Sequence, residues 1–182
     1  MTSRLQAVNP DAATGKTKEV LDTVKQKMGK VPNVFQLMAN SPAAVEGYLA
    51  FSGALAGGLL SPKLREQIAI TCAEVHICEY CLSAHYAIGK SIGMTDQELE
   101  EARSERAADP KSDAALSLTR MLITHKGDIS DAILAEVRTS GLTDGEIAEV
   151  IANVALNTFT NYFNLLAKTE VDFPRIKTAF PV

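Results

Sequence analysis

Apolar residues recur every three or four positions along most of the chain, which is the period of an amphipathic helix. The first such stretch predicts a helix over residues 17–28, and Gly29 follows it as a stop signal. No stretch alternates apolar and polar side chains in the way that a half-buried strand does. The pattern therefore predicts an all-α fold.

Start and stop residues divide the rest of the chain into further helices. Serine followed by proline, an N-cap and a first helical residue, occurs at Ser41-Pro42 and Ser61-Pro62. Capping boxes, in which threonine precedes glutamate by three residues, open helices at Thr95 and Thr143. Further starts are expected near Asn33, at Asp109-Pro110 and at Ser130, and stops at Gly57, Gly93, Gly127 and Gly141.

The chain has the size of one domain, with 182 residues and 19.5 kDa. We expect a single helical domain over residues 1–182, in which 1–16 form an N-terminal segment. Residues 171–182, which hold Pro174 and Pro181, are expected to form an irregular C-terminal arm. Arms of this kind often lie on a neighbouring subunit, so packing between subunits is part of the expectation.

Composition and charge exclude several classes of protein. A hydrophobic fraction of 46% is enough for a core and argues against intrinsic disorder. The net charge is −4 and no cluster of basic residues occurs, so we expect no nucleic-acid partner. The most apolar run, residues 49–60, is too short to span a bilayer, and the first residues do not resemble a signal peptide. The sequence therefore predicts a cytoplasmic protein with no membrane partner.

The chemistry is concentrated around the cysteines. Cys72 falls on the apolar face of the helix that starts at Pro62, which predicts a core thiol. Cys78 and Cys81 form a Cys-x-x-Cys pair, and His85 lies four residues after Cys81, on the same face of a helix. The first cysteine of such a pair at a helix N-terminus is stabilised as a thiolate, and a nearby imidazole can accept a thiol proton. Two residues of spacing also allow the sulfurs to close a disulfide.

A zinc site is the main alternative reading of this segment. Residues 72–85 contain five side chains that zinc accepts, His76 among them, but the usual second pair of ligands is missing from the sequence. Redox chemistry is therefore favoured, and neither a metal nor a cofactor is predicted. His76 has two interpretations, which are a solvated residue at a helix end and an additional proton-relay group near the thiols.

The order of these residues resembles the alkylhydroperoxidase D-like, peroxidase-related branch of the carboxymuconolactone decarboxylase superfamily. That branch carries a glutamate, a Cys-x-x-Cys pair and a histidine four residues after the second cysteine. Glu66, Cys78, Cys81 and His85 match this order, with the glutamate twelve residues before the first cysteine. The wider resemblance covers roughly residues 15–175, and segments 30–42 and 157–164 look like the longer members.

The resemblance implies a compact multi-helix fold and a peroxidase mechanism. It makes Cys81 the thiol that attacks peroxide, Cys78 the resolving thiol, His85 the base and Glu66 the group that orients the base. Alkylhydroperoxidase D has a further histidine immediately before the second cysteine, where this chain has Tyr80. Tyrosine forms hydrogen bonds but titrates near ~10, so its part in the relay is open.

The expected partners follow from the same resemblance. They are a small hydroperoxide as substrate, a dithiol or lipoyl-type electron donor, and further copies of the chain in a trimer or hexamer. Two other functions are retained. One is a dithiol–disulfide carrier with little peroxidase activity, and the other is a decarboxylase-like lyase of the same superfamily.

Four asparagines form the second unusual feature. Asn153, Asn157, Asn161 and Asn164 are spaced by four, four and three residues, which places them on one stripe of the last helix. Aromatic residues interleave with them, so a subunit interface or the lining of the active-site cavity is favoured for the stripe over the alternative of a plain solvent-facing surface.

Overall fold

The structure is a computed structural model, which describes residues 3–179. Over this range the chain forms helices joined by short turns and contains no strand, so the prediction of an all-α fold is confirmed. The helices are α1 Gly15–Met28, α2 Asn33–Met38, α3 Pro42–Ala56, α4 Pro62–Val75, α5 Glu79–Ser91, α6 Asp96–Arg103, α7 Pro110–Thr124, α8 Asp131–Thr139 and α9 Asp144–Ala167.

The helix termini form where the capping residues predict them. The Ser41 and Ser61 side chains accept hydrogen bonds from backbone N–H groups in the first turns of α3 and α4. Thr95 and Thr143 form complete capping boxes at the starts of α6 and α9. The first helix begins two residues earlier than predicted, at Gly15, because helix ends are decided by backbone geometry rather than by apolar spacing.

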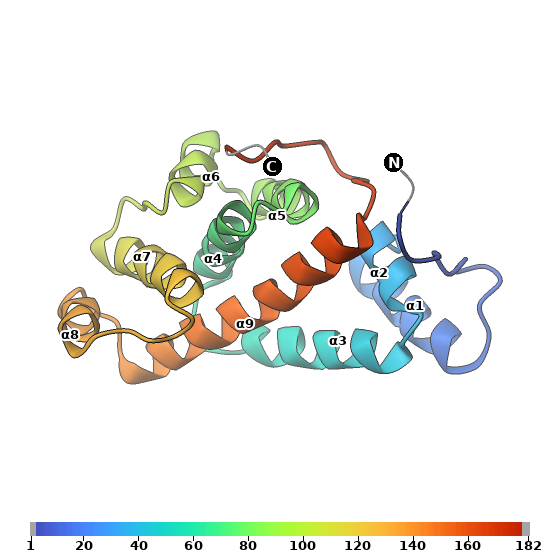
Figure 1. The fold of residues 1–182 in the computed structure, drawn as a ribbon, viewed down its shortest axis with the longest axis horizontal. Coiled ribbons are helices and arrows are strands. Elements are labelled where there is room, and N and C mark those ends of the chain that lie inside the picture. Colours follow the sequence, from blue (N-terminus) through green and yellow to red (C-terminus); the bar gives the residue numbers. More distant parts are fainter. Residues whose placement is uncertain (1–2, 180–182) are drawn as a thin grey trace.

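The longest helix, α9, crosses the molecule (Figure 1). It contacts α3 along one side, and α4, α5 and α7 along the other. In Figure 1, α1 and α2 lie near the C-terminal end of α9, and α7 and α8 near its beginning. The fully buried core residues include Leu21, Met38, Ile68, Leu82, Leu116 and Val150, which come from six different helices.

A tight turn joins α4 to α5 and reverses the chain. The N–H groups of Ile77 and Cys78 donate to the carbonyls of Glu74 and Ala73, at 3.0 and 2.8 Å, which is a Schellman motif. The left-handed residue of this motif is usually glycine, but here it is Ile77, with a φ of 56°. Strain of this kind is kept where the surrounding structure needs the geometry. The turn places Cys78 at the N-cap of α5.

The C-terminal arm lies against its own chain. Figure 1 shows it running from the end of α9 over α5 towards α6. The N–H of Ile176 donates to Ser83 Oγ at 3.0 Å, and the Arg103 guanidinium donates to the Lys177 carbonyl at 2.9 Å. The polar contacts of residues 171–179 are thus made with α5 and α6 of the same chain, and the expected packing of the arm on a neighbouring subunit stays a prediction. Pro181 lies outside the described residues.

Two further features of the fold concern membrane spanning and the third cysteine. Among residues 3–179, no helix combines the length and the apolar composition that crossing a membrane requires. Cys72 is fully buried, and burial raises the pKa of its thiol, so the prediction of a core cysteine is confirmed.

Candidate active site

The two cysteines of the Cys-x-x-Cys pair lie in contact at the start of α5. Their sulfur atoms are 2.7 Å apart, and both side chains are almost fully buried, at 1% exposure for Cys78 and 3% for Cys81. The Cys78 sulfur also accepts the backbone N–H of Cys81 at 3.4 Å, as the N-cap of the helix. Both thiols are free, and one can reach the other without a change of fold.

The surroundings of the two sulfurs favour different protonation states. The hydrogen bond between the two thiols lowers the pKa of Cys78, with further lowering by the N–H groups of Cys81 and Tyr80. Burial raises the pKa of Cys81, and the hydrogen bond with Cys78 raises it further. The hydrogen bond from the Asn164 amide and the nearby amide of Asn161 act in the opposite direction and favour the Cys81 thiolate. Of the two thiols, Cys78 is therefore the one that loses its proton more readily.

Glu66 and His85 come together although they belong to different helices. The Nδ1 atom of His85, in α5, lies 2.8 Å from Oε2 of Glu66, in α4. A carboxylate on Nδ1 fixes the ring so that Nδ1 carries the proton and Nε2 is left as the basic atom. Within residues 3–179 the His85 ring forms no direct hydrogen bond to either sulfur, so a bound molecule is needed to connect them.

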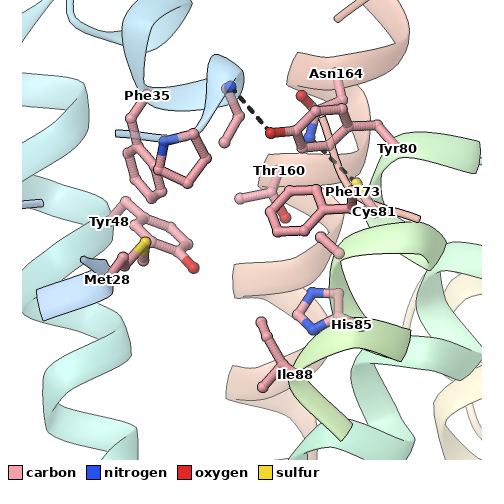
Figure 2. A pocket seen from close by; sticks show the side chains of 13 residues that line it. Met28, Phe35, Tyr48, Tyr80, Cys81, His85, Ile88, Thr160, Asn164 and Phe173 are labelled. Atoms are coloured by element: carbon pink, nitrogen blue, oxygen red, sulfur yellow. Dashed lines mark hydrogen bonds between the residues drawn. The ribbon is translucent and has the colours of Figure 1, made fainter. Parts of the chain in front are cut away.

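A small, mainly apolar pocket opens beside Cys81. Its volume is about 80 Å³, and Cys81 and His85 lie on one side of it with Ile88, one turn further along α5. Figure 2 shows Phe35 and Tyr48 on the opposite side. The other lining residues are Met28, Pro32, Val34, Tyr80, Ala84, Thr160, Asn164 and Phe173. Cys78 does not line the pocket, so a ligand bound there meets the Cys81 sulfur.

Tyr80 is held away from the proton-transfer groups. Its hydroxyl donates to Oδ1 of Asp172 at 2.8 Å and accepts the N–H of Val34 at 3.2 Å. Burial raises the pKa of Tyr80, so the hydroxyl keeps its proton at physiological pH. Asp172 also accepts a hydrogen bond from Lys30, and the ring of Phe173 packs edge-on against Tyr80. Tyr80 therefore fastens the arm and α2 to α5.

His76 lies at the C-terminal end of α4 and outside the pocket lining. Its Nε2 lies 3.2 Å from Thr158 Oγ1, and its ring packs edge-on against Tyr162. Burial lowers the pKa of His76 and favours the neutral ring. His76 is thus a partly buried helix-end residue that contacts α9, and in residues 3–179 it has no contact that would join it to the thiols.

The residues of the zinc alternative do not converge on one point. In the part of the chain that the structure describes, no three side chains of histidine, cysteine, aspartate or glutamate are placed to hold a metal ion together. The two pair sulfurs contact each other, and His85 is bonded to Glu66.

The asparagine stripe faces inward along its whole length. All four side chains are buried, and Asn164 lines the pocket and donates from Nδ2 to the Cys81 sulfur at 3.2 Å. Of the two placements considered for the stripe, the cavity lining is therefore the one observed for Asn164.

Nine of the thirteen residues that line the pocket are not candidates from the sequence, and three of them bring side chains from α3, α1 and the arm. Tyr48 of α3 lies across the pocket from Cys81, and burial and the negative charge of Glu66 raise the pKa of Tyr48 to about 12. Met28 and Phe173 come from α1 and the arm. The single hydroxyl in the otherwise apolar stretch 48–51 is the one sequence signal that could have pointed to Tyr48.

The sequence around the site is similar to that of a known protein family. The sequence model of the carboxymuconolactone decarboxylase family matches residues 42–123, which include Glu66, both pair cysteines and His85. The match covers 82 of the 182 residues, so the similarity to this family holds for that segment. The resemblance predicted from the sequence is confirmed. None of the curated proteins matches the chain closely enough in sequence to count as a relative.

Solved structures share the fold over nearly the whole chain. One is the alkylhydroperoxidase AhpD core of an uncharacterized peroxidase-related protein from Ralstonia eutropha JMP134, with a TM-score of 0.83, 22% identity and coverage of 94% of this chain and 93% of that one. A peroxidase-related protein from Silicibacter sp. TM1040 gives 0.79, with 21% identity and 93% coverage of both chains. The debrominase Bmp8, as a cysteine-to-alanine variant in complex with 2,3,4-tribromopyrrole, gives 0.78, with 16% identity and coverage of 94% and 93%.

At these identities the likeness shows the fold, which is that of the AhpD-like proteins. The matching family model is named for a decarboxylase. The matching structures are those of peroxidase-related proteins and of a debrominase. Because one fold carries several chemistries, the reaction of this chain has to be argued from its own site.

Proposed function

We propose that the protein is a thiol-dependent peroxidase, which reduces hydroperoxides to alcohols through Cys81 and Cys78. One observation carries the proposal. Two free sulfurs lie 2.7 Å apart, and the one that lines the pocket is Cys81. A substrate in the pocket meets one sulfur while the other is within reach behind it, which is what an attacking and a resolving thiol require.

The proposed reaction has two steps on sulfur. The Cys81 thiolate attacks the terminal oxygen of the hydroperoxide, so that an S–O bond forms as the O–O bond breaks. Sulfur supplies the electron pair and becomes a sulfenic acid, while the alkoxide takes a proton and leaves as alcohol. Cys78 then attacks the Cys81 sulfur, an S–S bond forms, and the sulfenic oxygen leaves as water. A dithiol donor is oxidised to its disulfide and restores both thiols.

Glu66 and His85 are proposed to move the protons. The Cys81 proton is held by the hydrogen bond to Cys78 in the resting pair, and Nε2 of His85 is the basic atom on the same side of the pocket. A hydroperoxide or a water molecule between them would connect sulfur to imidazole. His85 would take up the thiol proton and deliver it to the leaving alkoxide, while Glu66 stabilises the imidazolium.

The pocket favours a small organic hydroperoxide. Its walls are mainly aliphatic and aromatic, and about 80 Å³ holds a short alkyl group and a peroxide, but not a bulky cofactor. Burial of an alkyl group contributes about 25 cal/mol per Å² of apolar surface. We therefore expect a lower KM for tert-butyl hydroperoxide than for hydrogen peroxide.

The burial of the pair also bears on the dithiol-carrier alternative. Exchange with a partner protein needs a partner sulfur to approach a cysteine in line, and Cys78 and Cys81 are only 1% and 3% exposed. A dithiol donor on a thin, flexible arm, of the lipoyl type, fits this access better than a thiol on a folded surface. The same donor would serve the peroxidase.

The test is consumption of tert-butyl hydroperoxide with dihydrolipoamide as the reductant. We expect turnover by the unmodified protein, loss of at least about a hundredfold in Cys81→Ser, and a dimedone-trapped sulfenate at residue 81 in Cys78→Ser. Cys72→Ala is the matched control, because it removes the third thiol, which lies in the core away from the pocket.

Two results would overturn the proposal. Full peroxide turnover in Cys81→Ser would show that another group reacts. Rapid disulfide exchange with dihydrolipoamide and no peroxide consumption would select the carrier instead.

A further inference from the structure

The four buried asparagines of α9 fall into two pairs by what their amides contact. The Asn153 and Asn157 amides donate to the carbonyls four residues earlier in the helix, at 2.8 and 2.9 Å. The N–H donors of these two amides are thus satisfied by backbone carbonyls of α9 itself. The amides of Asn161 and Asn164 do not follow this pattern, although all four side chains are equally well buried.

The amides of Asn161 and Asn164 form no hydrogen bond to a carbonyl of α9, and one of them contacts the Cys81 sulfur. Asn164 donates from Nδ2 to the Cys81 sulfur at 3.2 Å. Asn161 is fully buried, and neither its Nδ2 nor its Oδ1 has a hydrogen bond partner. The carbonyl four residues before Asn161 already accepts the Thr160 hydroxyl at 2.9 Å. Asn161 nevertheless lies close enough to Cys81 for its amide to favour the thiolate.

A buried amide without a partner is costly, so its retention calls for an explanation. In the resting pair the Cys81 sulfur carries a proton, because burial raises the pKa of this thiol. Neutral sulfur is a weak acceptor, whereas a thiolate accepts hydrogen bonds strongly. An amide that is unsatisfied beside the thiol becomes satisfied when that proton leaves.

We infer that Asn164 and Asn161 are the two amides that hold negative charge on Cys81 when it reacts. The inference rests on the proposed function, in that Cys81 is taken as the reacting sulfur. Asn164 contacts the reacting atom and is a catalytic residue in this sense. Asn161 completes the site, because its amide gains a partner only in the charged state. Among the described residues no cationic side chain forms a hydrogen bond or ion pair with the Cys81 sulfur, so the neutral amides do this without a cation.

The step is a proton transfer followed by attack. The Cys81 proton moves to His85 through the bound molecule, and the electron pair that stays on the Cys81 sulfur is stabilised by the amide N–H groups. The same pair then forms the S–O bond with the hydroperoxide. The amides exchange no atoms or electrons with the substrate. They act as hydrogen-bond donors that lower the free energy of the charged sulfur.

The test measures the nucleophilicity of Cys81 without any peroxide. In a Cys78→Ser background, the rate of iodoacetamide alkylation at residue 81 is followed from pH 5 to 10, with the site verified by mass spectrometry. Cys72 does not interfere, because it is fully buried and its pKa is raised. Asn164→Leu and Asn161→Leu, which keep approximate size and lose the amide, are compared with Asn153→Leu as the matched control.

We expect Asn164→Leu to alkylate about tenfold more slowly at pH 7, with the pH profile displaced to higher pH, because a hydrogen bond to a charged group is lost. Asn161→Leu should shift the profile in the same direction, and Asn153→Leu should leave it unchanged. Should Asn164→Leu fail to give the helical circular dichroism of the parent, Asn164→Ala serves in its place.

An unchanged pH profile in folded Asn164 and Asn161 variants would overturn the inference. The outcome is separable from that of the proposed function. A parent protein that consumes peroxide, with variants that alkylate as the parent does, would reject the amide pair alone. A parent without peroxide turnover, in which the variants still shift the profile, would reject the peroxidase and keep the amide pair.

Discussion

Single residues at the site have functions that depend on which atom they contact. Tyr80 stands between the two cysteines, in a position where the resemblance suggested a relay group, yet its hydroxyl contacts Asp172 and the N–H of Val34. Its raised pKa keeps the proton in place. We therefore interpret Tyr80 as a structural residue that holds α2 and the C-terminal arm against α5. The proposed proton relay then consists of Glu66 and His85 alone.

Tyr80→Phe tests this interpretation. The change leaves the Val34 N–H without its acceptor and removes one donor from the Asp172 carboxylate, which keeps Lys30, so we expect the free energy of unfolding to fall by about 1–3 kcal/mol. The pH dependence of peroxide consumption should stay the same, since no titrating group is removed. Urea denaturation and a pH–rate profile measure the two quantities.

Asp172→Ala is the control for Tyr80→Phe, because it removes the acceptor of the same Tyr80–Asp172 hydrogen bond. It should destabilise the fold too, and the double variant should lose less than the sum of the two single losses, because both break one interaction. A changed pH profile with unchanged stability would instead place Tyr80 in the relay.

At the scale of elements, the turn between α4 and α5 makes the site. The Schellman motif at Ile77 places Cys78 as N-cap of α5, where its sulfur accepts the Cys81 N–H. The same reversal brings Glu66 of α4 beside His85 of α5. One strained residue thus positions both the thiol pair and its relay.

The capping contact predicts a difference between two substitutions at residue 78. Serine can keep the side-chain acceptor at the N-cap, and alanine cannot, so Cys78→Ala should be less stable than Cys78→Ser by about 1 kcal/mol. Urea denaturation monitored by circular dichroism measures it. Equal midpoints would show that the sulfur contributes nothing as a cap, and serine is in any case the cleaner variant for activity assays.

At the scale of the molecule, α9 has two different faces. Its inner face carries the asparagines and contacts α3, α4, α5 and α7. Its outer face leaves large apolar side chains in contact with solvent, with 60% exposure for both Tyr162 and Leu166 and 41% for both Phe159 and Leu165. Apolar surface concentrated on one helix is typical of a protein contact.

We propose that the chain forms a homo-oligomer in which this face is covered. Light scattering after gel filtration should give three or six times the chain mass of 19.5 kDa. Leu166→Glu should lower the mass, because a charge at a buried contact is not compensated. Lys126→Glu, at an exposed position in the turn after α7, is the control. A mass near 19.5 kDa for the parent would contradict the proposal.

The sequence by itself determined the helices and most of their limits, because capping residues, prolines and glycines act within a few positions of the chain. It also determined the order of Glu66, Cys78, Cys81 and His85, and hence the family that this segment resembles. It could not decide that Glu66 reaches His85, that Tyr80 bonds to Asp172 in the arm, or that Tyr48 faces the thiols.

Those contacts join residues that are distant along the chain, such as Cys81 and Asn164. They depend on the direction in which α5 leaves α4 and on the way α9 packs against both, and neither is a local property of the sequence. Helical spacing could place four asparagines on one stripe, but only the packing of α9 against α5 decided which of their amides reach the Cys81 sulfur.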